Sequence, residues 1–450
     1  MKDTNDDAAD DFSLQRVPQG ARFHWLSVAV QRFGMLSGLA SFLVGATLGF
    51  GMTFWNAFLA ITFGAIILEV VTIFIGIAGQ KEGLSTSVLA RWTGFGRSGS
   101  AFIGLAISIS AIGWFGIQNA ISARGLQDLL GVLPLWGWAL IFGMFITLIV
   151  MAGFGSMAWT AYITVPTFVI LAGYSIVSQI VDTGLHNLIT AEPAGPTLTL
   201  VQGTGIVAGA FVVGAVITPD MSRFNRSAAD VVKQTLVGIT LGEYVVGLAG
   251  VLLALALKTN DIVAILTSSS GFIGAIVVVA ATLKINDWNL YASSLGVVNF
   301  IDQVFGRHVD RRLITLVLGT VGTVLGAIGI LDNFVSFLTL LSVVFPPICG
   351  IMVAEYFVVK RWRADLTASG SRGELPATAP TWVPGSLVIW AASAAIGHYV
   401  HWGMPSINSL VVSLVLYVVA AQFGLTRGFG LSKTTGTQSV EVQKTSTQHL

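Results

Sequence analysis

The sequence predicts an all-α protein that crosses a membrane about twelve times. Of its 450 residues, 54% are hydrophobic and only 10% are charged, whereas a soluble domain is roughly a quarter charged. The mean hydropathy is +0.81. Apolar stretches long enough to cross a bilayer follow one another along most of the chain. The net charge of +1 argues against nucleic-acid partners, and the single cysteine, Cys349, excludes an internal disulfide framework.

We expect the spanning segments to be helices, because only helices and closed barrels satisfy the backbone inside lipid. Their approximate bounds are 24–47, 52–78, 99–123, 135–153, 157–181, 203–222, 232–257, 268–297, 311–330, 333–358, 382–400 and 406–425. With the N-terminus inside the cell, Arg124 and Lys258 fall in outer loops, and nearly all other Lys and Arg residues outside the segments are cytoplasmic. This asymmetry predicts a multi-pass protein of the cytoplasmic (inner) membrane with both termini in the cytoplasm.

The chain divides into a polar N-terminal tail, residues 1–23, a transporter domain, residues 24–426, and a C-terminal tail, residues 427–450. The tail 1–23 shows no cleavable signal peptide. Residues 367–381 have the composition of a flexible cytoplasmic loop. Residues 432–450 are rich in Thr, Ser, Gln and Lys, which predicts disorder.

An internal repeat is indicated by the first and sixth segments, which both interrupt their apolar run with small residues. The small residues of the first segment are Gly34, Ser37, Gly38, Ala40, Ser41 and Gly45, and those of the sixth are Gly205, Ala208, Gly209, Ala210, Gly214 and Ala215. Because they lie five segments apart, the two halves, about 24–181 and 203–358, would have opposite orientations in the membrane. The segments 382–425 would follow as two extra helices. Interrupted helices at matching places of inverted halves favour a substrate site at the midplane, although glycine in such helices is also common packing.

The eighth segment carries an unusual polar cluster of Lys284, Asn286, Asp287 and Asn289. A charged side chain at bilayer depth costs about 2.5–3.5 kcal/mol on insertion scales, so such residues usually face a cavity or a partner. A polar helix end at the interface is the alternative. Apolar and aromatic residues continue on both sides of the cluster, which favours a binding site.

The third segment contributes Trp114 and Gln118, which lie four residues apart and therefore on one helix face. An indole ring beside an amide is what a planar heterocycle with ring N–H and C=O groups requires. Phe211 in the sixth segment could cover the opposite face of the ring. Ordinary packing is the alternative for each of these residues.

Several stretches of the sequence resemble the cytosine permease and purine–cytosine permease branch of the nucleobase–cation symporter family 1. The resemblance runs in order from about residue 16 to residue 422. It is carried by TLGFG at 47–51, GWFG at 113–116, GAFVVGAVITPDMSRFNR at 209–226, INDWNLYASSLG at 285–296 and FPPICGIMVAEYF at 345–357.

The resemblance implies a LeuT-like fold with a five-plus-five inverted repeat, broken helices 1 and 6, and transport by alternating access. It implies that Trp114 and Phe211 sandwich the substrate and that Gln118, Asn286 and Asn289 bind it through their amides. The unwound part of helix 1, around Gly34 and Ser37, would offer free backbone groups.

Two positions depart from the family pattern. Sodium-coupled members place small hydroxyl residues where this chain has Lys284 and Ile285, and bacterial cytosine permeases have a glutamine where it has Ala111. Lys284 could replace the sodium ion and carry a proton, with Asp287 as a further coupling residue. The alternative is a permanently charged Lys284 paired with Asp287 or Glu243.

Three further charged residues, Arg32, Glu69 and Glu243, lie within apolar segments. An unpaired charge there is costly, so we expect them to pair across helices, with a proton relay as the alternative. No metal-ligand or nucleophile motif is evident, so we expect neither metal nor cofactor.

The sequence therefore predicts a secondary transporter importing a nucleobase or related planar heterocycle, proton-coupled and sodium-independent. Cytosine, purines, uracil, hydantoin, allantoin and pyrimidine vitamin precursors remain open as substrates. An intramembrane enzyme or a channel explains fewer of these features.

Overall fold

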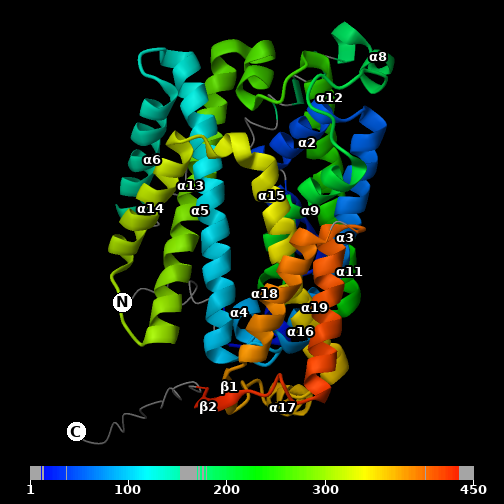
Figure 1. The fold of residues 1–450 in the computed structure, drawn as a ribbon, viewed down its shortest axis with the longest axis vertical. Helices are drawn as coiled ribbons and strands as arrows, with labels where there is room; N and C mark the ends of the chain where they lie inside the picture. The colour runs from blue at the N-terminus through cyan, green and yellow to red at the C-terminus, as the bar shows by residue number, and fades with distance from the viewer. Residues whose placement is uncertain are drawn as a thin grey trace, which may run out of the picture.

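The computed structural model describes residues 12, 15–36, 38–152, 170, 173–174, 177–178, 180–400 and 402–434. The described chain is a bundle of long helices whose axes run roughly along one direction (Figure 1). Most of the fifth predicted segment, 157–181, lies outside the described residues, so its path and the count of twelve spanning segments stay predictions.

The first half of the bundle begins with a broken helix. Helices α1 (Trp25–Leu36) and α2 (Leu39–Gly51) meet at an angle of 57°. The interruption predicted from Gly34, Ser37 and Gly38 is thus confirmed, although Ser37 itself lies outside the described residues. The helices that follow are α3 (Phe54–Glu82), α4 (Thr86–Leu89), α5 (Gly96–Leu130) and α6 (Leu135–Ala152).

Local signals explain where α3 begins and ends. The Thr53 side chain accepts a hydrogen bond from the Asn56 N–H at the start, as a typical N-cap does. The helix stops at Gly83, whose φ of 63° is left-handed and suits glycine. The positive charge of Lys81 in the last turn is stabilised by the negative end of the helix dipole.

The second half starts with α9 (Leu200–Val216), which opens with a capping box between Thr199 and Gln202. This helix continues without interruption through Gly205 and Gly209. The break in the sixth segment comes directly after the last of its small residues, Ala215, between Val216 and Pro219, where the one-turn helix α10 (Pro219–Ser222) begins. Proline is favoured at the first position of a helix, which explains the restart.

The remaining helices of this half follow in the predicted order. They are α11 (Ala228–Gly242), the π-helical turn η3 (Glu243–Gly247), α12 (Leu248–Leu257), α13 (Ile262–Phe305), α14 (Arg311–Ala327), the 3-10 turn η4 (Ile330–Asn333), α15 (Phe334–Val344), α16 (Pro346–Val353) and the π-helical turn η5 (Ala354–Val359). Helix α13 is kinked at Gly271, whose φ of 55° and ψ of −136° are not helical.

Glycines allow the helices of the two halves to approach closely. A Cβ atom at Gly45 of α2 would lie 2.0 Å from the backbone oxygen of Gly247, which is a severe clash. Small residues at such crossings let backbones approach where lipid offers no hydrophobic driving force. The glycine-rich composition therefore has a direct packing role at this crossing.

The segment after η5 differs from the prediction. Residues 367–381, predicted as a flexible loop, contain the end of α17 (Arg363–Gly370) and most of β1 (Thr378–Trp382). Strand β1 pairs antiparallel with β2 (Phe429–Lys433), which lies in the predicted C-terminal tail. This two-stranded ribbon is an addition to the all-α architecture. Helices α18 (Pro384–Tyr399) and α19 (Pro405–Gln422) lie between its strands in the sequence.

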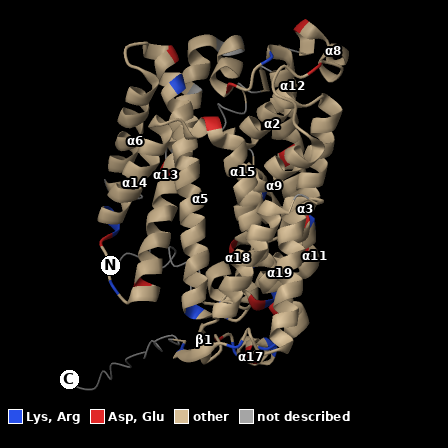
Figure 2. Cartoon of the chain, viewed as in Figure 1, with Lys and Arg blue, Asp and Glu red and all other residues tan. Residues whose placement is uncertain are grey.

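Six described helices are long and apolar enough to cross a membrane, and the bent pair α1–α2 makes a seventh. The shorter elements η1 (Gln19–Ala21) and α8 (Leu185–Ile189) lie outside these spans. Lys, Arg, Asp and Glu residues gather at the two ends of the bundle and are sparse between them (Figure 2). The end that carries β1, β2 and α17 is called the ribbon end below.

Candidate functional site

Helices α5 and α13 form an antiparallel pair that positions most of the predicted site residues. Three contacts fix their register. The Ser293 hydroxyl donates to the Ser108 backbone oxygen over 3.1 Å, the Asn286 amide donates to the Phe115 backbone oxygen over 3.1 Å, and Ser122 and Thr282 join their hydroxyls. Gln118 and Trp114 of α5 therefore lie at the same level as residues 283–289 of α13.

Trp114 is half-buried and is enclosed on one side by two phenylalanine rings of α15. Its ring centroid lies 6.0 Å from that of Phe334 and 5.7 Å from that of Phe337, with interplanar angles of 73° and 83°. Edge-to-face contacts of this kind are favourable between aromatic rings. The Phe337 ring also packs on Gly113, where a Cβ atom would approach it to 2.4 Å. The sequence prediction missed both phenylalanines, although their spacing of three residues places them on one helix face.

The side-chain amides of Gln118, Asn286 and Asn289 differ in how many of their atoms have hydrogen-bond partners. Gln118 and Asn286 are buried. The Asn286 Nδ2 bonds to Phe115, but its Oδ1 has no hydrogen-bond partner among the described residues. The Gln118 Oε1 and the Asn289 Nδ2 are likewise buried without a partner there. Buried polar groups are usually paired, so these three atoms are candidate contacts for a polar ligand.

Helix α13 also meets the interruption of the first helix. A Cβ atom at Gly38 would lie 3.8 Å from the Ile285 Cδ1, so Ile285 faces the break. Asn289 follows Ile285 by four residues and shares this face of the helix. Gly34 has open space where a side chain would begin. Ser37, predicted beside it, lies outside the described residues.

Phe211 of α9 is half-buried and does not contact the Trp114 ring within the described part of the chain. Helix α15 links the two regions. Its Phe337 packs on α5, while the backbone oxygen of the next residue, Leu338, would lie 1.9 Å from a Cβ atom at Gly209 of α9. Trp114 and Phe211 therefore come from two helices that share α15 as a neighbour.

The two predicted coupling residues occupy other faces of α13. At about 100° per residue, Asp287 is turned about 200° from Ile285, and it is buried. Lys284 occupies the face of Trp288, which is 55% exposed, and the side chain of Lys284 lies outside the described residues. Neither position shares the face that Ile285 and Asn289 present to the first helix.

Two of the three charges expected to pair across helices, Arg32 and Glu69, contact neutral groups instead. Arg32, fully buried in α1, donates to Gln234 over 3.1 Å and to Thr218 over 3.2 Å. Glu69 accepts a hydrogen bond from the Thr240 hydroxyl. The ion pairs recorded among the described residues do not include Arg32, Glu69 or Glu243. Hydroxyl and amide groups instead join Arg32 and Glu69 to neighbouring helices.

A hollow of about 290 Å³ adjoins Trp114 through Phe334, which lines it. It lies at the end of the bundle opposite the ribbon. Arg124 stands at its edge, 3.3 Å from an oxygen of Asp261 and 3.6 Å from an oxygen of Asp332. These contacts connect the end of α5 to the start of α13 and to η4, which precedes α15. Arg124 thus anchors the segment that positions Phe334.

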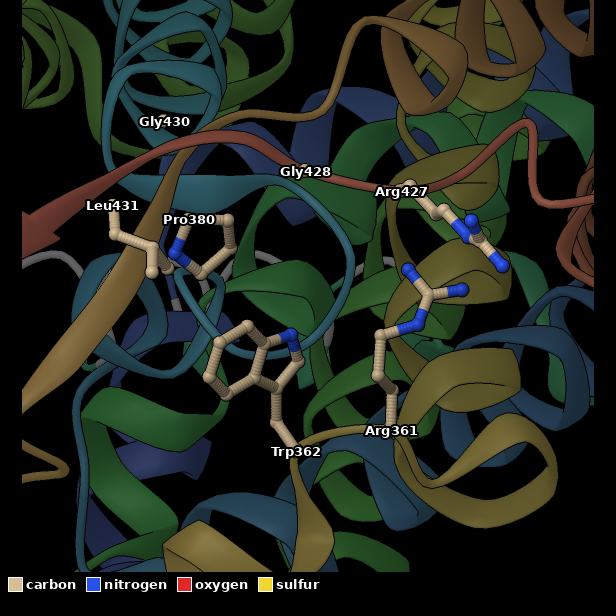
Figure 3. Close-up of a pocket in the computed structure, with 7 residues that line it drawn as sticks. All are labelled: Arg361, Trp362, Pro380, Arg427, Gly428, Gly430 and Leu431. Atoms are coloured by element: carbon tan, nitrogen blue, oxygen red, sulfur yellow. The ribbon is translucent and has the colours of Figure 1, made fainter.

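A second hollow, of about 650 Å³, lies on the ribbon, away from the tryptophan site. Arg361 and Arg427 point toward each other across it, and the Trp362 indole lies beside them (Figure 3). Arg361 donates to the Thr426 hydroxyl over 3.0 Å. Both arginines are exposed, so this hollow is a feature of the surface.

Known proteins with similar sequences are permeases. A cytosine permease of Escherichia coli (strain K12) is 30% identical over 410 residues, which cover 91% of this chain and 93% of that protein. A hydantoin permease of Microbacterium maritypicum is 23% identical over 362 residues, which cover 76% of this chain and 74% of that protein.

The fold matches that of Mhp1 in its inward facing conformation, with a TM-score of 0.76 and 19% sequence identity over 91% of this chain and 93% of that one. Residues 17–420 match the model of the family of permeases for cytosine/purines, uracil, thiamine and allantoin. The chain therefore belongs to this family within the nucleobase–cation symporters, and it is a multi-pass membrane transporter, not an enzyme.

Proposed function

We propose that this chain imports cytosine or a closely related planar heterocycle by alternating access, with Trp114, Gln118 and Asn289 as its main ligands. The identity to a cytosine permease, higher than that to a hydantoin permease, supports this substrate class. Hydantoin or allantoin is the second candidate, because Ala111 occupies a position where the resemblance to cytosine permeases implies glutamine.

The observation that carries the proposal is that buried amide atoms without a partner among the described residues lie at the level of an indole along the paired helices α5 and α13. The Gln118 Oε1 can accept a hydrogen bond and the Asn289 Nδ2 can donate one, and both are buried without a partner among the described residues. Trp114 lies one turn from Gln118 on α5. A flat ring with N–H and C=O groups would satisfy these amides at its edge while stacking on the indole. Phe211 would cover the other face of the ring, and Gly34 and Ser37 would line the site with backbone groups.

The proposed role of Asn286 is smaller. Its Nδ2 already bonds to Phe115, so only the Oδ1 remains for a ligand. We assign Asn286 mainly to positioning α13 against α5. A contact between its Oδ1 and a ring N–H would add to the binding that Asn289 provides.

The proposed coupling ion is the proton. The apolar Ile285 faces the break of the first helix, where transporters of this architecture hold a cation with backbone oxygens. A hydrocarbon side chain there offers the ion no ligand. Lys284 and Asp287 are the proposed coupling residues, because ionisable groups at membrane depth commonly serve as proton relays.

The proposed location is the cytoplasmic (inner) membrane, with both termini in the cytoplasm. The distribution of Lys and Arg supports this orientation. It places the ribbon end in the cytoplasm and the hollow beside Arg124 at the outer face.

Counterflow in proteoliposomes tests the function. Purified protein in liposomes preloaded with unlabelled cytosine should accumulate labelled cytosine transiently and with saturation, and protein-free liposomes should not. Competition by uracil, hypoxanthine, hydantoin and allantoin ranks the substrates. If none of these compounds gives saturable counterflow, the proposed substrate class is wrong.

A further inference from the structure

A cavity at the ribbon end has no role in the transport cycle described above. Its volume is about 510 Å³, and three parts of the chain form its walls: the segment from α4 to the first turns of α5, the last turns of α13, and the ribbon of β1 and β2. Its charged lining residues are Arg91, Arg97, Asp302 and Lys433, and Gln303 and Thr434 also line it. None of them belongs to the site around Trp114.

The cavity has an excess of positive charge. Arg91, Arg97 and Lys433 line it together with one carboxylate, Asp302, which already contacts the Nδ1 of His308 over 2.9 Å. Within the described part of the chain, the ion pairs include none of the three cations. Burial, and secondarily the nearby charge of Arg97, lower the pKa of Arg91. The effect of Arg97 on Arg91 shows that the two guanidinium groups lie near each other, and neither has an ion pair among the described residues.

Unpartnered polar atoms come from all three walls. The Arg91 Nε, the Gln303 Oε1 and the Thr434 Oγ1 are buried and have no hydrogen-bond partner among the described residues. The Arg91 N–H and the Thr434 hydroxyl can donate to an anion, and the Gln303 oxygen can accept from a hydroxyl group. A phosphate that carries a hydroxylated substituent would satisfy the three atoms together.

One rim of the cavity is aromatic. Phe300 lines it, and its ring centroid lies 5.0 Å from that of Phe102 and 6.0 Å from that of Phe305. Phe305 is 64% exposed. A free inorganic anion has no apolar surface that could pack on this aromatic rim, whereas the acyl chains of a lipid would pack on it. Both α5 and α13 are long and apolar enough to span the membrane, so their ends at this cavity would lie near the headgroups.

We propose that this cavity binds the headgroup of an anionic phospholipid with a hydroxylated substituent, such as phosphatidylglycerol. The phosphate lies between Arg91 and Arg97, the headgroup hydroxyl bonds to Gln303, and the acyl chains run along Phe300 and Phe305. Clusters of basic residues at the membrane surface commonly recognise anionic lipids. The bound lipid would connect the start of α5, the end of α13 and the ribbon. With the orientation proposed above, it belongs to the cytoplasmic leaflet.

The test measures lipid binding without any transported substrate, so its outcome is independent of the proposed transport function. Delipidated full-length protein in detergent is titrated with phosphatidylglycerol, phosphatidylcholine or inorganic phosphate. The readouts are the thermal unfolding temperature and the number of lipids retained in native mass spectrometry. A ligand that binds the folded protein and not the unfolded chain raises the unfolding temperature of the protein. We expect a saturable increase with phosphatidylglycerol and none with the other two compounds.

The main variant combines Arg91→Gln with Arg97→Gln. Its matched control combines Arg307→Gln with Arg312→Gln, which removes the same charge from exposed positions near the same end without touching the cavity. We expect phosphatidylglycerol affinity to fall about thirty-fold in the main variant, a loss typical of two basic residues at a membrane surface, and to stay unchanged in the control. If the main variant does not fold, Lys433→Gln combined with Thr434→Val tests the opposite wall.

Three outcomes would overturn the proposal. Equal affinity of the wild type and both cavity variants would place the lipid elsewhere. An equal loss in the control would show attraction to the general charge of this end. An equal shift with inorganic phosphate alone would identify a soluble anion, not a lipid, as the ligand.

Discussion

The side-chain amide of Asn286 donates a hydrogen bond to the backbone oxygen of Phe115 over 3.1 Å, and this bond joins α13 to α5 inside the bundle. Asn289, three residues further along, has a buried Nδ2 without a hydrogen-bond partner among the described residues. Two asparagines of one sequence cluster therefore have different surroundings. Asn286 joins the helix pair, while Asn289 keeps a donor without a partner among the described residues, which we propose as a ligand contact.

This difference predicts different effects of the two alanine substitutions. Asn289→Ala should weaken substrate binding and change which heterocycles compete for uptake, because a hydrogen-bonding site discriminates against analogues that leave its polar groups unpaired. Asn286→Ala should mainly lower stability, by about 1 kcal/mol for a lost buried hydrogen bond. The measurements are competition profiles in proteoliposomes and thermal unfolding of the two variants. Gln118→Ala should resemble Asn289→Ala. If both Asn289→Ala and Gln118→Ala keep the wild-type competition profile, the amide assignment is wrong.

Trp114 is predicted to stack on the substrate ring. Trp114→Ala should lower the affinity roughly ten- to a hundred-fold, since stacking of a base on an aromatic side chain contributes about 1–3 kcal/mol. Trp114→Phe should retain part of the affinity, because a smaller aromatic face remains. Affinity is measured as the half-saturating concentration for counterflow, with size-exclusion profiles to confirm folding. An Ala variant that transports with unchanged affinity would place the binding site elsewhere.

Gly209 and Gly205 form a matched pair on α9 for testing the packing against α15. A Cβ atom at Gly209 would lie 1.9 Å from the Leu338 backbone oxygen, whereas at Gly205 its nearest neighbour would be the Ser342 Oγ at 3.9 Å. Gly209→Ala should therefore displace α15, reduce stability by about 1–3 kcal/mol or more, and impair transport. Gly205→Ala should be tolerated and should even favour the helix slightly. Thermal unfolding and uptake distinguish the two. Similar behaviour of the variants would contradict the close crossing.

The sequence predicted the helical body of the fold well, because each long apolar segment has to become a helix in lipid. The break in the first helix followed from its small residues. The ribbon was missed because β1 and β2 pair across about fifty residues of sequence, and each is only five residues long, too short for its pattern to identify a strand. The composition of these segments resembled that of loops, while their pairing depends on how α18 and α19 return the chain.

The site was predicted in part. The spacing of Trp114 and Gln118 places both on one helix face without any tertiary information. The contacts of Trp114 with Phe334 and Phe337 depend on how α15 packs, which the sequence pattern does not specify. The same limit applies to Asn286 and Asn289. Whether an amide faces a neighbouring helix or a ligand depends on the rotation of α13 about its axis. Successive residues of a helix point in directions about 100° apart, so a shift of one residue changes which side chain faces the site.

The driving ion is predicted from Ile285, whose Cδ1 would lie 3.8 Å from a Cβ atom at Gly38 in the break of the first helix. Uptake by the wild type should not respond to an inward sodium gradient, because Ile285 supplies no oxygen where the ion would lie. An inward proton gradient should stimulate uptake. Both gradients are imposed on proteoliposomes at equal membrane potential, with labelled cytosine as substrate. Stimulation by sodium would refute the proposal that this chain works without the ion.

Lys284→Gln then tests the proposed proton carrier. Glutamine keeps much of the side-chain length but cannot exchange a proton, so the variant should lose the response to the proton gradient while still exchanging labelled for unlabelled substrate. Lys258→Gln makes the same chemical change in the loop after α12 and should behave as the wild type. If a proton gradient drives Lys284→Gln as strongly as the wild type, Lys284 does not carry the proton. Asp287→Asn, tested in the same way, would then show whether the other ionisable residue of the cluster does.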